Sequence, residues 1–322
     1  MTEDDVLART VAVINGKGGV GKTSIVANVG GLLALAGYQV LLIDLDPQGN
    51  LGEDLGFTAV SDHGESLTRA VQFGGPLVPM KGVRPDLDVC PAGEHLDDLA
   101  SAVAGRIRRQ GGEGALALAN SLRTIAGDYD IVLIDCPPGD ATLQTLALAA
   151  ARWVLVPTKT DASSRKGLRE VARRFTEARQ LNPQLQLLGV VLFGVATGAT
   201  RVKERARDLV AVDLGGAAPI LTASIRHVEA AATDARERGE LAHELERTAA
   251  AGPTWWQRRR GATAGPVIAA SASSLAGDYQ ALAQELVATV VAAEKLLALT
   301  MTEPDSPGPG QAPEPSTRLE TA

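Results

Sequence analysis

The stretch TVAVINGKGGVGKTS, residues 10–24, decides the fold of this chain. It opens with an apolar run from Val11 to Ile14, which predicts a buried strand. Three glycines follow that permit backbone angles closed to other residues, namely Gly18, Gly19 and Gly21. Successive amides in such a loop turn inward around an anion, so the junction predicts a phosphate-binding loop.

Two side chains and a helix complete this loop. Lys22 brings a positive charge to the β- and γ-phosphates, Thr23 offers a hydroxyl to Mg²⁺, and a helix starting near Thr23 directs its positive dipole end at the same anion. A glycine-rich turn without a ligand is the alternative, and the strand and helix patterns on either side argue against it. The residues predicted to contact the nucleotide are Gly16, Lys17, Gly18, Gly19, Val20, Gly21, Lys22, Thr23 and Ser24.

Lys17 adds a second lysine that an ordinary phosphate loop does not need. With it, Lys17 through Thr23 match the pattern KGGxGKT, and the segment resembles the deviant-Walker-A ATPases of the ParA/MinD family. In that family the early lysine reaches across a dimer interface to the phosphates bound by the other subunit. The resemblance therefore implies an ATP-sandwich homodimer, with Lys17 and Lys22 both stabilising the transferring phosphoryl group. A solvated loop charge is the alternative for Lys17.

A second motif follows one strand later. A helix expected over residues 24–36 leads to the buried strand 38–43, whose carboxyl end carries Asp44 and Asp46. Two carboxylates at a strand end beside a phosphate loop are costly unless they face a cation or a water that is activated. The resemblance implies that Asp46 orients the attacking water and that Asp44 contacts magnesium through its water shell. Two acids that merely cap a strand are the alternative.

The third motif is the segment YDIVLIDCPPG, residues 129–139. An apolar run that ends in aspartate is how a buried strand delivers one carboxylate to the magnesium shell of a P-loop enzyme, which makes Asp135 the Walker B candidate. Cys90 and Cys136 have no metal-ligand spacing and indicate a reduced, cytoplasmic protein. The related nitrogenase iron protein places cluster cysteines beyond this strand, an arrangement that the chain lacks.

Length and composition favour a single large α/β domain. The chain has 322 residues, 45% of them hydrophobic, and no apolar stretch of about twenty residues. Further core strands are expected at 154–157 and 187–193, so the fold class is a doubly wound, mainly parallel sheet with helices on both faces, a P-loop NTPase. The predicted organisation is a lead (1–9), the ATPase domain (10–299) with a loop-like insert around 249–273, and a disordered tail (300–322). The polar lead shows no signal peptide, and the resemblance is to the short form without an N-terminal helix-turn-helix.

The basic residues of the C-terminal third bear on DNA. The formal net charge is −7, but basic residues can cluster on one surface of an acidic protein. Family members bind DNA non-specifically in their ATP state, and Arg201, Lys203 and Arg226 are the candidate contacts by resemblance. The alternative is that these arginines pair with neighbouring acids on solvated helices. A further segment, Trp255 to Arg260, is either a contact site or tryptophans folded back onto the body.

The C-terminus separates branches of the family. MinD proteins end in a basic amphipathic helix, whereas residues 280–299 carry Glu285, Glu294 and a single base, Lys295, which argues against membrane attachment. The tail has no tyrosine, which argues against the related tyrosine kinases.

The resemblance implies a Mg²⁺-dependent ATPase that is slow alone and stimulated by a ParB-like centromere-binding partner. Its predicted task is partition of plasmid or chromosomal DNA, and its predicted location is cytoplasmic and nucleoid-associated. Three alternatives remain: positioning of a protein cargo, a MinD-like spatial regulator, and a nucleotide-dependent binding module whose hydrolysis is vestigial.

Overall fold

The computed structural model describes residues 5–196, 200–213, 219–252 and 271–302. Within these residues one eight-stranded sheet runs in the order β3-β4-β2-β5-β1-β6-β7-β8. Neighbouring strands are parallel except β3 and β4, which are antiparallel. This confirms the predicted mainly parallel sheet. The strands are β1 Thr10–Val13, β2 Val40–Asp44, β3 Met80–Arg84, β4 Leu87–Cys90, β5 Ile131–Asp135, β6 Trp153–Thr158, β7 Gln186–Val195 and β8 Ile220–Arg226.

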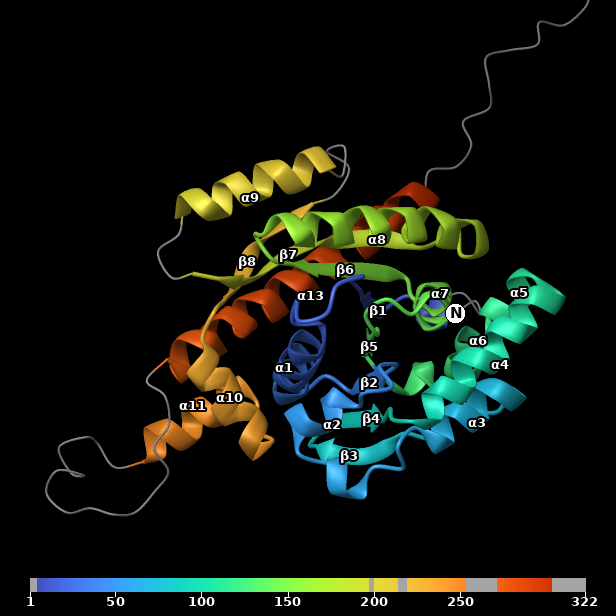
Figure 1. Ribbon diagram of the computed structural model, residues 1–322, viewed down its shortest axis with the longest axis horizontal. Coiled ribbons are helices and arrows are strands. Elements are labelled where there is room, and N and C mark those ends of the chain that lie inside the picture. Colours follow the sequence, from blue (N-terminus) through green and yellow to red (C-terminus); the bar gives the residue numbers. More distant parts are fainter. Residues whose placement is uncertain (1–4, 197–199, 214–218, 253–270, 303–322) are drawn as a thin grey trace, which may run out of the picture.

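Helices cover both faces of this sheet (Figure 1). The α-helices among the described residues are α1 Lys22–Leu35, α2 Asn50–Leu55, α3 Glu65–Phe73, α4 His95–Gln110, α5 Gly112–Ala115, α6 Ala117–Arg123, α7 Ala141–Ala150, α8 Ala162–Leu181, α9 Thr200–Asp213, α10 Glu229–Arg238, α11 Ala242–Ala251 and α13 Ala272–Thr302. Short 3-10 turns lie at Asp5–Leu7, Thr58–Val60 and Ala126–Asp128. None of the described helices is both long enough and apolar enough to cross a membrane.

Two apolar clusters, one on each face, explain why the strands read as continuous hydrophobic runs. Val11 and Val13 of β1 belong to the cluster that also holds buried residues of α1, α11 and α13. The alternate residues Ala12 and Ile14 belong to the other cluster, with α4, α6, α7 and α8. Since successive side chains of a strand point to opposite faces, a strand covered on both faces has no polar positions.

The register of the central strands brings the three sequence motifs to one edge. Val13 pairs with Asp135 across β1 and β5, and Asp44 pairs with Asp135 across β2 and β5. Ile14 and Asn15 connect the end of β1 to the phosphate loop, which therefore starts at this same carboxyl edge. In an open parallel sheet ligands bind outside the carboxyl ends of the strands, so the fold itself assembles the candidate site.

Several expected segments differ from the structure or lie outside it. Both ends of the loop-like insert expected around 249–273 are helical in the structure. Ala249 to Ala251 complete α11, and residues 272 and 273 begin α13. The segment Trp255 to Arg260 and the tail from residue 303 lie outside the described residues. The expected helix of residues 280–299 lies within the longer helix α13, which begins eight residues earlier.

Candidate nucleotide-binding site

The phosphate loop depends on two glycines in left-handed conformations. Gly19 has φ 70° and Gly21 has φ 85°, a region that other residues rarely adopt. Gly21 is constrained a second time, because a Cβ added there would collide with the ring of Phe193, which comes from β7. The turn into α1 therefore tolerates no side chain at Gly21.

Asn15 fixes the beginning of the loop. Its side chain is fully buried, and its Nδ2 donates to the carbonyl oxygen of Pro157 at 2.7 Å. Its Oδ1 accepts from the backbone amide of Lys17 at 2.9 Å. One side chain thus ties the loop to the end of β6, a contact that the sequence pattern did not reveal.

The two lysines of the loop have different partners. Lys22 is buried, and its Nζ lies 3.4 Å from the carbonyl oxygen of Lys17, inside the loop. The Nζ of Lys17 instead lies 3.0 Å from Oδ1 of Asp161, directly before α8. About a third of the Lys17 side chain is exposed. Lys17 therefore does not share the place of Lys22, as its early position in the loop predicts.

Three carboxylates lie at the ends of β2 and β5. Asp44 and Asp135 are almost completely buried and Asp46 is 7% exposed. Oδ1 of Asp44 accepts from the amide of Asp46 at 2.9 Å, and Oδ1 of Asp46 accepts from the amide of Gln48 at 3.1 Å. These local hydrogen bonds hold the segment after β2 in a defined shape, with Asp46 lining the cavity described below.

Burial dominates the protonation of the two deepest acids. Burial raises the pKa of Asp135 to about 7, against the opposing effects of the Thr23 hydroxyl and the Lys22 charge. The pKa of Asp44 is also raised, by burial first and then by the charge of Asp135. Two such carboxylates side by side favour a cation between or beside them.

The residues present fit a magnesium ion. Both carboxylate oxygens of Asp135 and Oδ2 of Asp44 are buried, and no hydrogen bond of normal geometry from the described residues reaches them. Buried unpartnered oxygens cost free energy that a cation would recover. The described residues contain no group of three or more His, Cys, Asp or Glu side chains suited to a metal. Mg²⁺ is commonly held by one or two carboxylates together with substrate phosphates.

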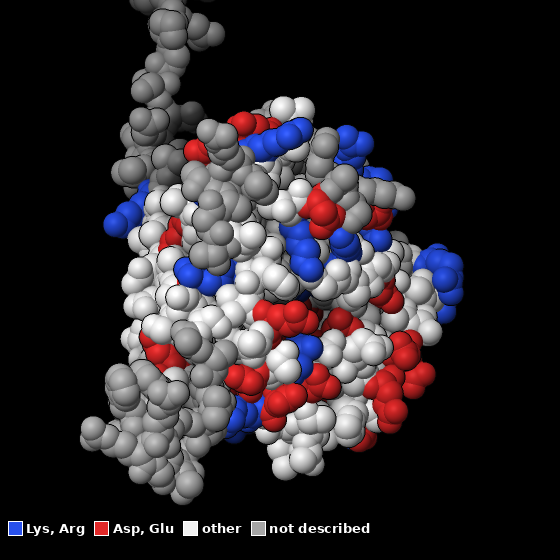
Figure 2. Space-filling model, turned by 60° about the vertical axis from the view of Figure 1, so that its left-hand side comes forward, with Lys and Arg blue, Asp and Glu red and all other residues white. Residues whose placement is uncertain are grey.

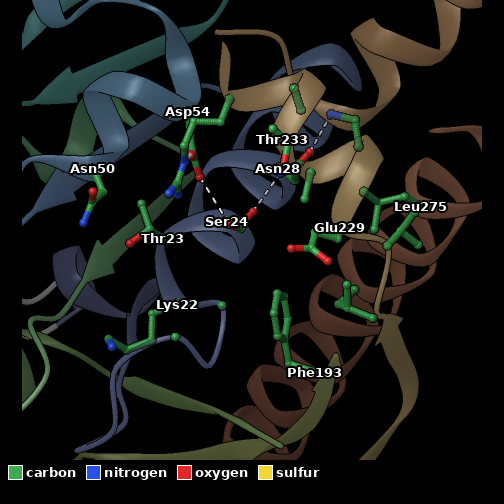
Figure 3. Close-up of a pocket in the computed structure, with 18 of the residues that line it drawn as sticks. Lys22, Thr23, Ser24, Asn28, Asn50, Asp54, Phe193, Glu229, Thr233 and Leu275 are labelled. Carbon is green, nitrogen blue, oxygen red and sulfur yellow. Dashed lines mark hydrogen bonds and ion pairs between the residues drawn. The ribbon is translucent and has the colours of Figure 1, made fainter. Parts of the chain in front are cut away.

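A cavity of about 650 Å³ opens from the phosphate loop. Lys22, Thr23 and Ser24 line one side of it, and Glu229 of α10, Leu275 of α13 and Phe193 lie across from them (Figure 3). The phosphate-binding part occupies only one end, so the rest has room for the nucleoside of a nucleotide. Sequence reasoning missed this far wall, because its residues follow no motif.

The predicted DNA contacts are in different situations. Arg201 and Lys203 lie in α9, and their side chains are outside the described part of the chain. Arg226 ends β8 and forms a bidentate ion pair with Asp278, with Nε 2.7 Å from Oδ2 and Nη2 2.8 Å from Oδ1. On the face shown in Figure 2, basic side chains (blue) and acidic side chains (red) are interspersed, and the basic ones lie mainly in the upper half.

This arrangement defines a P-loop nucleotide hydrolase: a glycine loop between a buried strand and a helix, a lysine inside it, and buried acids at the carboxyl ends of β2 and β5. Comparison with known families matches residues 8–187 to the family described as AAA domain. The chain is 38% identical over 189 residues to the chromosome partitioning protein ParA of Caulobacter vibrioides. The aligned region covers 57% of this chain and 68% of that protein.

Two solved structures share the fold. Cyanothece McdA in complex with ATP is 19% identical with a TM-score of 0.67, covering 86% of this chain and 96% of that one. The Mycobacterium smegmatis structure titled cobyrinic acid a,c-diamide synthase, with bound ADP and magnesium, is 28% identical with a TM-score of 0.57, covering 81% and 99%. The chain therefore belongs to the ParA/MinD family of P-loop ATPases, as a ParA-type member.

Proposed function

We propose that this protein is an ATP-dependent dimerising switch that binds DNA without sequence specificity in its ATP state and partitions plasmid or chromosomal DNA. The observation that carries the proposal is the different placement of the two loop lysines. Lys22 is buried in the loop, whereas Lys17 is partly exposed and its ammonium group is held by Asp161. A lysine so placed is suited to reach the phosphates bound by a second subunit.

In the proposed reaction, the loop amides and Lys22 bind and orient the triphosphate. Asp46 orients the attacking water, and Lys22 with Lys17 from the other subunit stabilises charge on the transferring phosphoryl group. Thr23, Asp135 and Asp44 would hold magnesium, which would supply positive charge to offset that of the phosphates. Hydrolysis separates the dimer and ends DNA binding, and a ParB-like partner accelerates this step.

The test is binding of the purified protein to non-specific duplex DNA with ATP, ADP or no nucleotide, at two salt concentrations. We expect binding with ATP alone, weaker at higher salt because phosphate contacts release counterions. Lys17→Ala should abolish it, and light scattering should show that this variant stays monomeric with ATP. Equal DNA binding in all nucleotide states would contradict the switch.

A protein cargo is the second candidate, and one observation favours it. Basic residues of the C-terminal third are paired with acids: Arg226 with Asp278, and Arg236 with Asp54. Paired charges contribute less to binding a polyanion than free ones. If ATP dimerises the protein but no nucleotide state binds DNA, the cargo is a protein, and the ATP-bound dimer can be used to isolate it.

A further inference from the structure

A buried carboxylate joins the phosphate loop to the far wall of the cavity. Asp54 lies in α2, the helix that begins four residues after Asp46, and its side chain is only 10% exposed. Its Oδ1 accepts from Nε of Arg236 in α10 at 2.7 Å, and its Oδ2 accepts from the Ser24 hydroxyl at 3.3 Å. Three elements far apart in sequence therefore meet at one side chain.

The carboxylate depends on these partners. Burial raises the pKa of Asp54, and the hydrogen bonds and charge of Arg236 and Ser24 act in the opposite direction. The guanidinium of Arg236 also lies 3.8 Å from the exposed Glu53, but Asp54 is the closer partner. A buried acid with a single cationic partner is destabilised strongly when that partner is removed.

The ion pair is part of a wider contact between α2 and α10. The glycines that end these helices, Gly56 and Gly239, touch so closely that a Cβ at Gly239 would collide with the backbone of Gly56. Arg84 of β3 donates to the Leu55 carbonyl at 3.1 Å and to the Gly239 carbonyl at 2.9 Å. The C-terminal end of α10 is thus held against α2 by backbone contact, by Arg84 and by the Arg236 ion pair.

Helix α10 lines the cavity along its length, Arg236 included, and Asp54 lines the cavity too. Glu229 and Thr233 both line the cavity, and Figure 3 shows Glu229 on the side opposite Lys22 and Thr23. Triphosphate bound by the loop leaves the nucleoside to occupy the remainder of the cavity, where α10 is. The position of α10 therefore affects contacts to the nucleoside more than contacts to the phosphates.

We propose that Asp54 and Arg236 are positioning residues that hold α10 as the nucleoside-facing wall of the site, so that nucleotide affinity depends on their ion pair. The proposal rests on the proposed binding of ATP. It assigns neither residue a chemical step. By linkage, a bound nucleotide in turn stabilises the contact between α2 and α10.

The experiment compares Arg236→Ala with Arg238→Ala in the full-length protein. Both variants remove an arginine from the last turn of α10, but only Arg236 pairs with a buried acid. Calorimetric titration measures Kd for magnesium-ATP and for magnesium tripolyphosphate, which carries the phosphates without a nucleoside. We expect Arg236→Ala to raise the Kd for ATP about tenfold, the usual scale of one charge-assisted hydrogen bond. The Kd for tripolyphosphate should stay within about twofold, and Arg238→Ala should match the wild type in both.

A steady-state measurement and a conservative variant separate positioning from general destabilisation. Arg236→Ala should raise KM for ATP with kcat nearly unchanged, and Arg236→Lys should recover most of the affinity. An equal loss of affinity for ATP and tripolyphosphate, or a lower Tm with unchanged Kd, overturns the proposal. If the wild type itself binds no ATP, the proposed function fails, which a separate wild-type titration shows first.

Discussion

The ion pair between Lys17 and Asp161 makes a prediction about dimerisation. Lys17 holds both oxygens of Asp161, with Nζ at 3.0 and 3.3 Å, and this contact is made within one chain. A lysine that serves the other subunit has to leave it first. Asp161→Asn removes the competing charge, so it should shift the ATP-bound protein toward the dimer.

The size of the shift follows from the exposure of the pair. The Lys17 and Asp161 side chains are 34% and 45% exposed, which places the pair near the surface class worth about 0.5–1 kcal/mol. A symmetric dimer breaks two such pairs, so the gain is about 1–2 kcal/mol, or a roughly 5- to 30-fold lower dimer dissociation constant.

Sedimentation equilibrium with ATP measures that constant, in an Asp46→Ala background so that turnover does not deplete the dimer. Glu113→Gln is the control, because it removes one negative charge from an exposed position on α5. We expect tighter dimerisation for Asp161→Asn alone, and a smaller effect at high salt. An unchanged or weaker dimer would refute the view that Asp161 competes for Lys17.

Three further substitutions test the site. Asp46→Ala should bind ATP normally but hydrolyse it about 10²–10⁴-fold more slowly by phosphate release, and normal hydrolysis would exclude its water-orienting role. Asp135→Asn should weaken binding of magnesium-ATP. In EDTA at pH 8 it should raise the free energy of unfolding by on the order of 2 kcal/mol, because the buried acid has a pKa of about 7 and is costly to ionise. A lower Tm of the variant under these conditions would contradict this. Gly21→Ala should lower the free energy of unfolding by about 3 kcal/mol and abolish ATP binding. Gly37 is also left-handed but lies in open space, so Gly37→Ala should lower the free energy of unfolding, measured with urea, by only about 1 kcal/mol.

The parts of the fold that could be predicted from the sequence share one property: their secondary structure is determined by residues close in the chain. The strand ending at Asp135 was predicted from its apolar run, and β5 has nearly those bounds. The helix expected from residue 24 begins two residues earlier, at Lys22, because the left-handed Gly21 already ends the loop. Boundaries of this kind shift by a residue or two since the backbone of the cap, and not the pattern, decides them.

The far wall of the cavity was not predictable in the same way. Asp54 and Arg236 are separated by 182 residues, and each looks like an ordinary charge on a solvated helix. Arg236 is one of the basic residues of the C-terminal third, yet its closest partner is a buried acid. Only the packing of α10 against α2 brings the two together, and nothing in either local pattern encodes that packing.

The position of α2 has a consequence for how binding and hydrolysis are related. Asp46, proposed to orient the water, and Asp54, proposed to hold the nucleoside wall, lie at the two ends of one short segment. Hydrogen bonds from the amides of Asp46 and Gln48 to the side chains of Asp44 and Asp46 hold the first part of that segment, and Gly49 in a left-handed conformation precedes α2. A displacement of α10 with the Arg236 ion pair intact would therefore also displace α2 and the segment that carries Asp46, whereas loss of the ion pair uncouples α10 from that segment. A partner protein that binds α10 would thus have a short physical route to Asp46, the residue proposed to orient the water.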